Sequence, residues 1–201
     1  MLTAPLKLKT WRWTVKRYDH AAALGWFAGK RVELIEGRVF KMPPQLEPHV
    51  FTVERAAKEL ERVFGKGYCV RRQSPLALSK RSKPEPDIAV VRGEPEDFLT
   101  RGAPTSALLV VEVSDKTIRY DLGEKASVYA KLAVAEYWVI NLIKRQVERH
   151  RDPIPDRSYR FQHRYADITA FGDSVTISSL AKPNVQIRVA DLLPPGRSQT
   201  A

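Results

Sequence analysis

The chain has 201 residues, of which 43% are hydrophobic and 28% are charged, and its formal net charge at pH 7 is +11. This length and apolar content allow one domain to bury a core, which excludes a disordered chain. No apolar run approaches the ~20 residues that span a bilayer, and the N-terminus lacks the apolar segment of a signal peptide. Cys69 is the single cysteine, so no internal disulfide can form. We therefore expect a cytoplasmic globular protein with no membrane partner.

Positive charge is concentrated in two parts of the chain. Between positions 144 and 164 there are seven Lys or Arg residues against three acids, and a second cluster lies at positions 80–83. Basic stretches of this kind suit a polyanion such as nucleic acid, although they can also serve only to keep a protein soluble. The side chains that we expect to contact nucleic acid are Lys80, Arg81, Lys83, Lys144, Arg145 and Arg149.

The N-terminal part of the chain predicts a helix and a hairpin. A loosely held lead, residues 1–13, comes first, and Thr14 is expected to cap a helix over residues 14–28. Residues 31–42 then read as two short strands around the turn Glu36–Gly37.

The central part predicts an α/β fold of the α+β type with a mixed sheet. An apolar face over residues 47–64 indicates a helix, which Gly65 ends. Asp121 and Glu124 have the spacing of a capping box, which places the start of a second helix at Asp121. Four strands are expected, at 68–78, 86–92, 107–113 and 136–141. The expected core order is therefore helix, three strands, helix, strand, or αβββαβ.

The C-terminal part predicts further strands at an edge of the sheet. The strand at 136–141 is expected to turn back into residues 146–150. Short alternating stretches follow, at 159–163, 174–178 and 185–189. The sequence shows no linker, so we expect one domain over residues 14–193, between flexible termini at 1–13 and 194–201.

Lys125 lies on the apolar side of its predicted helix. Leu122, Lys125, Tyr129 and Leu132 recur at spacings that place them on one stripe facing the protein. A buried ammonium is costly without a partner. The preceding strand offers one, because Glu112 is its one polar side chain. A buried lysine beside a buried carboxylate at a strand–helix junction suggests a functional site.

Two further acids extend this candidate site. Asp87 begins the strand before that of Glu112, so adjacent strands can bring the two carboxylates within a few ångströms. Close carboxylates repel one another, and a divalent cation that prefers hard oxygen ligands, Mg²⁺ or Mn²⁺, relieves the repulsion. Glu33 lies inside a strand-like apolar run and is a fourth candidate.

Each of these residues also has a purely structural interpretation. Glu112 and Lys125 could form a buried salt bridge, Asp87 could simply begin a strand after proline, and Glu33 could pair with a neighbouring arginine. Three buried ionisable groups on adjacent elements are rare by chance, which favours a functional site.

Several short segments, found in order between residues 14 and 150, point to a known family. They are Val32-Glu-Leu-Ile-Glu-Gly-Arg-Val39, Lys41-Met-Pro-Pro44 followed by His49, Pro86-Asp-Ile-Ala-Val90, Leu109-Val-Val-Glu-Val-Ser114, Tyr120-Asp-Leu-Gly-Glu-Lys125 with Tyr129, and Glu136-Tyr-Trp-Val139. This ordered set resembles the Uma2 family, also called DUF820, of the PD-(D/E)XK nuclease superfamily. The resemblance implies a restriction-endonuclease-like αβββαβ core with an extra N-terminal helix and hairpin and extra C-terminal strands.

The resemblance also implies roles for individual residues. Asp87 and Glu112 would be metal ligands, Lys125 the catalytic lysine, and Glu33 an additional catalytic acid. In the superfamily's usual pattern the lysine lies two residues after the second acid, where this chain has Ser114. The Uma2-like pattern instead draws the lysine from the following helix. The auxiliary candidates are His49, Asp121 and Tyr129.

The leading hypothesis is Mg²⁺- or Mn²⁺-dependent hydrolysis of phosphodiester bonds in nucleic acid, with DNA as the expected substrate. The alternative is a nucleic-acid-binding or regulatory module that keeps the fold without catalysis. A carboxylate-pair hydrolase acting on sugars is a third interpretation, but it explains neither Lys125 nor the positive charge. We also expect a homodimer, because relatives of this fold commonly pair and because the chain has more aromatic side chains than a small core requires, namely Trp11, Trp13, Tyr137 and Trp138.

Overall fold

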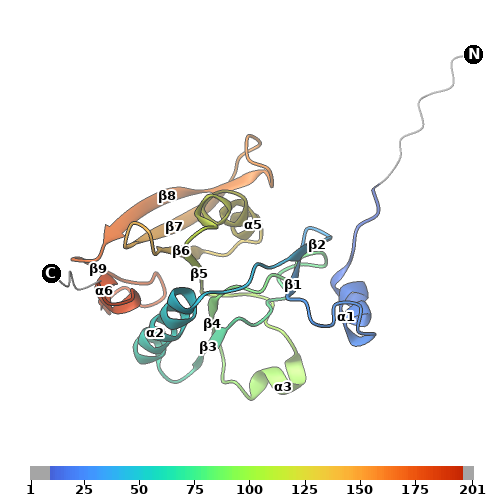
Figure 1. Ribbon diagram of the computed structural model, residues 1–201, viewed down its shortest axis with the longest axis horizontal. Coiled ribbons are helices and arrows are strands. Elements are labelled where there is room, and N and C mark those ends of the chain that lie inside the picture. The colour runs from blue at the N-terminus through green and yellow to red at the C-terminus, as the bar shows by residue number, and fades with distance from the viewer. Residues whose placement is uncertain (1–9, 197–201) are drawn as a thin grey trace, which may run out of the picture.

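The structure is a computed structural model that describes residues 10–196, and its centre is a mixed six-stranded sheet (Figure 1). The strands lie in the order β3-β4-β5-β6-β7-β8, with β5 and β6 parallel and the other neighbours antiparallel. The predicted α+β fold with a mixed sheet is therefore confirmed. The six strands are β3 (Tyr68–Arg72), β4 (Ile88–Arg92), β5 (Leu109–Ser114), β6 (Glu136–Asn141), β7 (Gln146–Pro155) and β8 (His163–Gly172).

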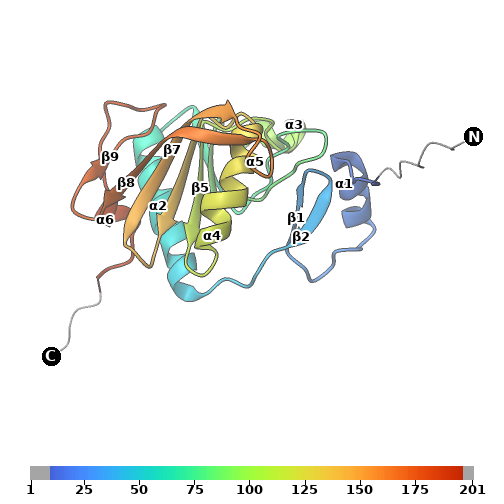
Figure 2. The ribbon, with the colours of Figure 1, turned by 90° about the horizontal axis from the view of Figure 1, so that it is seen from above.

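Helices cover both faces of this sheet. Helix α2 (Glu47–Phe64) packs on one face together with the short α6 (Val189–Leu192). The other face is covered by one helical segment, which consists of α4 (Ile118–Tyr120), the π-helical turn η1 (Asp121–Lys125) and α5 (Ala126–Lys131). Figure 2 shows α2 on one side of β5 and the α4–α5 segment on the other. The chain order is α2-β3-β4-β5-α5-β6, the predicted succession, with the small α3 (Asp97–Arg101) inserted between β4 and β5.

The central strands are apolar because both of their faces are covered. Every residue of β5 and of β6 is buried. Trp138 packs into the core on the α2 side, and Tyr137 packs on the α5 side. Both rings are fully buried, so their use as evidence for a dimer interface is wrong. The most exposed aromatic side chains in the described residues are instead near the N-terminus, where Trp11 is 60% exposed and Trp26 is 61% exposed.

Helix α1 (Val15–Ala23) begins where the sequence predicts it and ends earlier. The Thr14 hydroxyl accepts a hydrogen bond from the amide of Arg17, as a helix cap does. The helix ends at Ala23 rather than near residue 28, because Gly25 has a φ of +80° and turns the chain. The expectations of flexibility at residues 1–9 and 197–201 lie outside the described residues.

The predicted hairpin is present as β1 (Val32–Ile35) and β2 (Arg38–Lys41). Glu36 and Gly37 between them have φ values of +48° and +75°, which is the backbone of a type I′ hairpin turn. The Tyr18 hydroxyl donates to the carbonyl of Val32 over 2.8 Å and so joins α1 to the hairpin. Helix α1 and the β1–β2 hairpin lie together at one end of the molecule (Figures 1 and 2).

The remaining differences from the sequence-based expectation concern strand lengths and the tail. Strand β3 ends at Arg72 rather than 78, because Gln73 has a φ of +44° and Pro75 follows. Residues 159–162 form a turn before β8, and only β8 extends the sheet edge. The last two strands, β9 (Thr176–Ile177) and β10 (Ile187–Arg188), pair with each other in a separate sheet. No helix within residues 10–196 is long and apolar enough to cross a bilayer.

Candidate active site

Asp87 and Glu112 meet on two adjacent strands of the central sheet. Asp87 directly precedes β4, and Glu112 lies within β5. These strands pair with Ile88 opposite Val111, so the same register continued by one residue sets Asp87 opposite Glu112. The backbone amide of Val113 donates to Asp87 Oδ2 over 2.9 Å, which ties the two strands together at this point. Both carboxylates line one pocket of about 150 Å³.

Lys125 reaches Glu112 from the helical segment that follows β5. Its Nζ lies 2.8 Å from Glu112 Oε1 and 4.0 Å from Glu33 Oε1, and the residue is 2% exposed. Tyr129, one helical turn further on, donates its hydroxyl to Glu112 Oε1 over 2.8 Å. The helical period therefore brings Lys125 and Tyr129 to the same carboxylate.

The capping box expected at Asp121 is not formed, and that prediction is wrong. Asp121 lies within continuous helical backbone, at φ −68° and ψ −41°, because the helix already begins at Ile118. Its carboxylate instead accepts hydrogen bonds from the hydroxyls of Ser114 at 2.7 Å and Thr117 at 2.6 Å. The π-helical turn that starts at Asp121 carries Lys125 at its last position. Such turns inside α-helices are frequent at functional sites.

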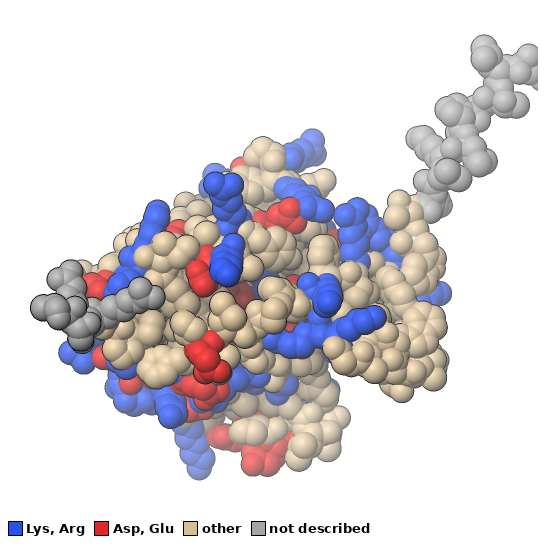
Figure 3. Space-filling model, viewed as in Figure 1, with Lys and Arg blue, Asp and Glu red and all other residues tan. Residues whose placement is uncertain are grey.

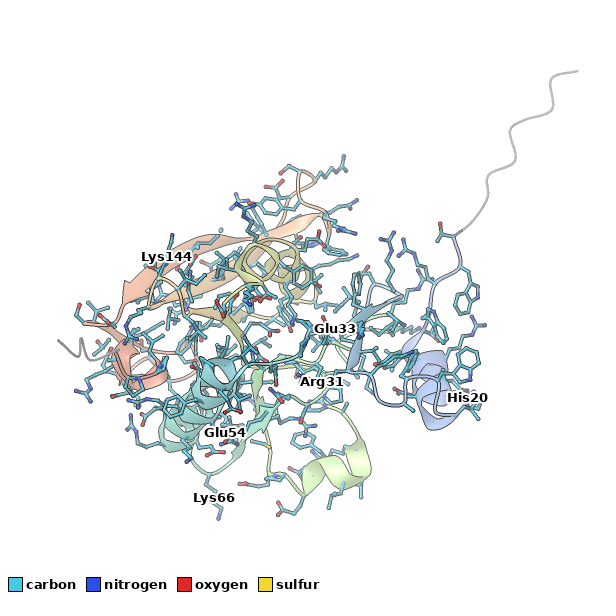
Figure 4. All side chains as sticks on the ribbon, in the orientation of Figure 1. His20, Arg31, Glu33, Glu54, Lys66 and Lys144 are labelled. Atoms are coloured by element: carbon cyan, nitrogen blue, oxygen red, sulfur yellow. The ribbon has the colours of Figure 1, made fainter. Side chains whose placement is uncertain are left out.

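Glu33 joins the site from β1 of the hairpin, and Figure 4 labels it beside Arg31. The residue is 1% exposed, and its Oε2 accepts a hydrogen bond from the amide of Glu85 over 3.2 Å. Its Oε1 has no hydrogen-bond partner in the part of the chain that the structure describes. Arg31 pairs with Glu85 at 2.8 Å, so the alternative pairing of Glu33 with this arginine is wrong. Glu33 therefore has one carboxylate oxygen that lies 4.0 Å from Lys125 Nζ without a hydrogen bond from any described residue.

His49 and Gln45 hold the Asp87 carboxylate, and the side chain of Gln73 holds Gln45. His49 Nε2 lies 3.0 Å from Asp87 Oδ2, and Gln45 Nε2 donates to Asp87 Oδ1 over 3.2 Å. Gln73 in turn donates to Gln45 over 2.8 Å. The sequence analysis named His49 but missed both glutamines, because an uncharged amide in a loop has no recognisable pattern.

The site carries more negative than positive charge, since the Lys125 ammonium faces four carboxylates: Glu33, Asp87, Glu112 and Asp121. Burial raises the pKa of Glu112 well above its usual value, Lys125 offsets this only in part, and Asp87 raises it further. Burial also opposes ionisation of Asp87, but the hydrogen bond and charge of His49, together with Lys125, lower the pKa of that carboxyl. The carboxylates hold the pKa of Lys125 well above its ordinary value against the effect of burial. An additional cation would relieve this excess of negative charge.

The side chains present suit a hard divalent cation that keeps part of its water shell. Within residues 10–196 there is no group of three or more His, Cys, Asp or Glu side chains placed to hold a metal ion. Mg²⁺ needs fewer, because it usually keeps several waters and binds through one or two carboxylates. Asp87 and Glu112 provide two carboxylates in the pocket, and Glu33 Oε1 is a nearby oxygen without a hydrogen bond in the described residues. These residues therefore fit the Mg²⁺ or Mn²⁺ that the sequence analysis expects.

The basic residues predicted to contact nucleic acid do not line this pocket. Figure 4 shows Lys144 far from Glu33, and Figure 3 shows Lys and Arg spread over the viewed face rather than gathered in one patch. The positive side chains that line the pocket besides Lys125 are Arg31 and Lys116, which the sequence analysis did not select. Of the predicted set, those paired with acids are Lys83, Arg145 and Arg149, and those exposed are Lys80, Arg81 and Lys144.

Comparison with known proteins identifies the family. The profile of Uma2, described as "Putative restriction endonuclease", matches residues 21–190. The chain belongs to the Uma2 family. A solved structure of similar fold is that of "a putative nuclease belonging to DUF820" from Anabaena variabilis ATCC 29413, with a TM-score of 0.57 and 13% sequence identity. The match covers 81% of this Uma2 chain and 89% of that chain. No curated protein matches the chain. The Uma2 resemblance inferred from the ordered segments is thus confirmed.

Proposed function

We propose that this Uma2 protein is a metal-dependent endonuclease that hydrolyses phosphodiester bonds of nucleic acid, with DNA as its substrate. The observation that supports the proposal is the meeting of Asp87, Glu112 and Lys125 at one pocket, with Lys125 Nζ 2.8 Å from Glu112. The αβββαβ order, read as a restriction-endonuclease-like core, supports the same reaction class.

The proposed reaction would use five side chains in or beside the pocket. Asp87 and Glu112 would hold the metal ion, and a bound Mg²⁺ or Mn²⁺ polarises a phosphate and lowers the pKa of its own water. Lys125 would orient the attacking water or stabilise negative charge that develops on the phosphate. Tyr129 fixes Glu112 and His49 fixes Asp87 through the hydrogen bonds described above, which reduces the freedom of both carboxylates.

The position of the lysine is consistent with this assignment. Ser114 stands where the superfamily's usual pattern has its lysine, and its hydroxyl is used to hold Asp121. Lys125 reaches the second acid from the next helix instead, within hydrogen-bond distance of Glu112. A lysine that arrives by a different route therefore supplies the ammonium at the same carboxylate.

A cleavage assay tests the proposal. Plasmid and oligonucleotide substrates would be incubated with the parent protein in Mg²⁺, Mn²⁺ or EDTA, beside Asp87→Asn, Glu112→Gln and Lys125→Ala. The matched control is Glu136→Gln, since Glu136 is also a fully buried glutamate, on the neighbouring strand β6, but pairs with Arg151 at 2.6 Å.

We expect cleavage by the parent with either metal, none with EDTA, and loss of cleavage in the three site variants while the Glu136 control stays active. Folding of every variant would be checked by thermal unfolding, so that loss of structure is not read as loss of chemistry. A parent that cleaves nothing with either metal, or a Glu112→Gln variant as active as the parent, would contradict the assignment.

A nucleic-acid-binding or regulatory module without catalysis is the second candidate. The observation that favours it is that Lys125 and Tyr129 already occupy Glu112 Oε1, and that residues 10–196 contain no three-ligand metal group. This candidate predicts binding without cleavage. In both cases the logarithm of the affinity for duplex should fall with the logarithm of salt concentration by ~0.9 per phosphate contact. An affinity that is independent of salt would rule out the expected contact with the nucleic-acid backbone.

A further inference from the structure

A second pocket, of about 410 Å³, lies at the turn of the β1–β2 hairpin. Most of its charged lining is positive, with Glu36 as the one acid. We call it the hairpin pocket and define it by its five basic side chains, Arg12, Arg38, Arg81, Lys131 and Arg160. These come from five separate segments: the N-terminal lead, β2, the loop after β3, the end of α5, and the turn before β8.

The backbone of the hairpin turn holds three of these segments together. The amide of Gly37 donates to the carbonyl of Arg81 over 2.7 Å, and the carbonyl of Gly37 accepts from the amide of Trp13 over 3.0 Å. A Cβ added to Gly37 would lie 2.7 Å from the Cβ of Arg12, so only glycine lets the lead pass this close to the turn. The arginines are therefore placed by fixed backbone contacts rather than gathered by chance on a flexible surface.

The positive charge of the hairpin pocket is not balanced. Glu36 is already paired with Lys131 at 2.5 Å, and Arg160 pairs with an acid outside the pocket. The other three basic side chains have no carboxylate within ion-pair distance anywhere in residues 10–196: Arg12, Arg38 and Arg81. Like charges held together by the backbone repel one another, and a bound anion relieves the repulsion. Planar guanidinium groups suit phosphate in particular.

Two aromatic rings indicate more than a bare phosphate. Phe40 and Phe161 line the same pocket, and both are only partly buried. The Arg160 guanidinium lies 5.8 Å from the centroid of the Phe161 ring. Cations that follow a backbone, combined with exposed rings on which bases stack, are characteristic of proteins that bind single strands. The volume is also in the range of pockets that take a small organic molecule rather than an ion alone.

We propose that the hairpin pocket binds one nucleotide of an unpaired nucleic-acid strand, with the phosphate at the unpaired arginines and the base against Phe40 and Phe161. This rests on the proposed function, because the strand is taken to be the one that enters the active site. Lys131 follows Lys125 by six residues on one helical segment, roughly 9 Å along its axis. That is about three nucleotide steps at the ~3.4 Å rise of a stacked duplex strand, and fewer for a more extended single strand. A strand with its scissile phosphate at Lys125 thus reaches the pocket within a few nucleotides.

Binding measured without cleavage tests the phosphate part of the proposal. Fluorescence anisotropy would follow the full chain binding a labelled single strand of about 12 nucleotides in EDTA. Arg38→Ala/Arg81→Ala is compared with Lys58→Ala/Lys66→Ala, which removes two exposed charges outside the pocket, one on α2 and one in the turn that follows it. We expect weaker binding in the first double variant only, with a salt slope that is smaller by ~0.7 for each phosphate that the variant no longer binds. Equal effects of the two double variants would overturn the proposal.

The aromatic part has its own comparison. Phe161→Ala should weaken single-strand binding about tenfold. Phe161→Leu, which keeps the bulk without the aromatic face, should weaken it as well, and duplex of the same sequence should bind all three proteins alike. A loss shared equally by duplex, or a mononucleotide that binds as tightly as the strand, would overturn the proposal.

The outcomes also separate this proposal from the proposed function. A parent that binds through the pocket but cleaves nothing refutes the endonuclease alone. A parent that cleaves while Arg38→Ala/Arg81→Ala binds normally refutes the hairpin pocket alone.

Discussion

Removing the Lys125 ammonium gives a direct test of the charge arrangement in the active site. The Lys125 and Glu112 side chains are 3% and 4% exposed, and their charged atoms lie 2.8 Å apart. In Lys125→Ala, Glu112 would lose its nearest compensating group, so the variant must either hold an uncompensated buried charge or take up a proton at a carboxyl whose pKa burial already raises. Breaking a buried pair by removing one partner typically costs about 3–5 kcal/mol. We expect a loss of unfolding free energy in this range, measured by urea denaturation at neutral pH.

Two further measurements separate this effect from simple loss of packing. In the double variant Glu112→Gln/Lys125→Ala no uncompensated charge remains at these positions, so the total loss should be smaller than the sum of the two single losses. Mg²⁺ should partly restore the stability of Lys125→Ala, because a bound cation replaces the ammonium, and by about 2.7 kcal/mol at a concentration 100 times its dissociation constant. Glu112→Gln should gain little from Mg²⁺, because it has lost a metal ligand.

These variants should lose cleavage for different reasons. Glu112→Gln should bind the metal more weakly, whereas Lys125→Ala should bind it and fail only at the reacting phosphate. A destabilisation of Lys125→Ala below about 1 kcal/mol would contradict the buried-pair reasoning, since exposed pairs contribute that little. If Mg²⁺ raises the stability of neither the parent nor Lys125→Ala, the binding module becomes the better account.

Three other predictions concern the rest of the molecule. Burial lowers the pKa of His150 to about 4 against 6.5 in the unfolded chain, so the folded protein should lose up to about 3 kcal/mol as pH falls from about 6.5 to 4, and His150→Phe should lack this component of the pH dependence. Leu60→Ala truncates a buried side chain of α2 and should lower the unfolding free energy by about 2–5 kcal/mol. The stabilisation of the protein by Mg²⁺ should stay unchanged in this variant, and a change would show that the core is coupled to the site. We propose a homodimer formed through the exposed Trp11 and Trp26, so sedimentation at micromolar concentration should show dimers that Trp26→Ser converts to monomers, and a monomeric parent would refute it.

The parts of the site that the sequence could predict are those with a strong periodic or charge signal. The helical spacing placed Lys125 on the buried stripe, and the apolar surroundings of Glu112 marked it as unusual. The start of that helix was misplaced, because Asp121 and Glu124 have capping-box spacing whether or not the chain before them is already helical. In the structure the helix already begins at Ile118, and the hydroxyls of Ser114 and Thr117 donate hydrogen bonds to the Asp121 carboxylate.

Other features had no local signal in the sequence. The sequence did not show that Tyr137 and Trp138 lie in the core rather than at an interface. A central strand that is covered on both faces and an apolar strand at a surface have the same composition. The partner of Glu33 lies 92 positions away in Lys125, and the hydrogen bonds of Gln45 depend on a loop packing beside Asp87. The hairpin pocket likewise joins residues from position 12 to position 160, which only the folded chain brings together.

The π-helical turn that carries Lys125 has a consequence for how such proteins diverge. A π-helical turn accommodates one residue more than an α-helix in the same length, and each residue of an α-helix advances by about 100° around its axis. Deletion of a single residue between Asp121 and Lys125 could therefore be absorbed as regular α-helix, with α5 undisturbed on the sheet. Insertions and deletions in this short segment would then be tolerated by the fold. Lys125 directly precedes α5 and would stay with it, so the number of residues between Glu112 and the lysine can change without a change in the place of the lysine in space.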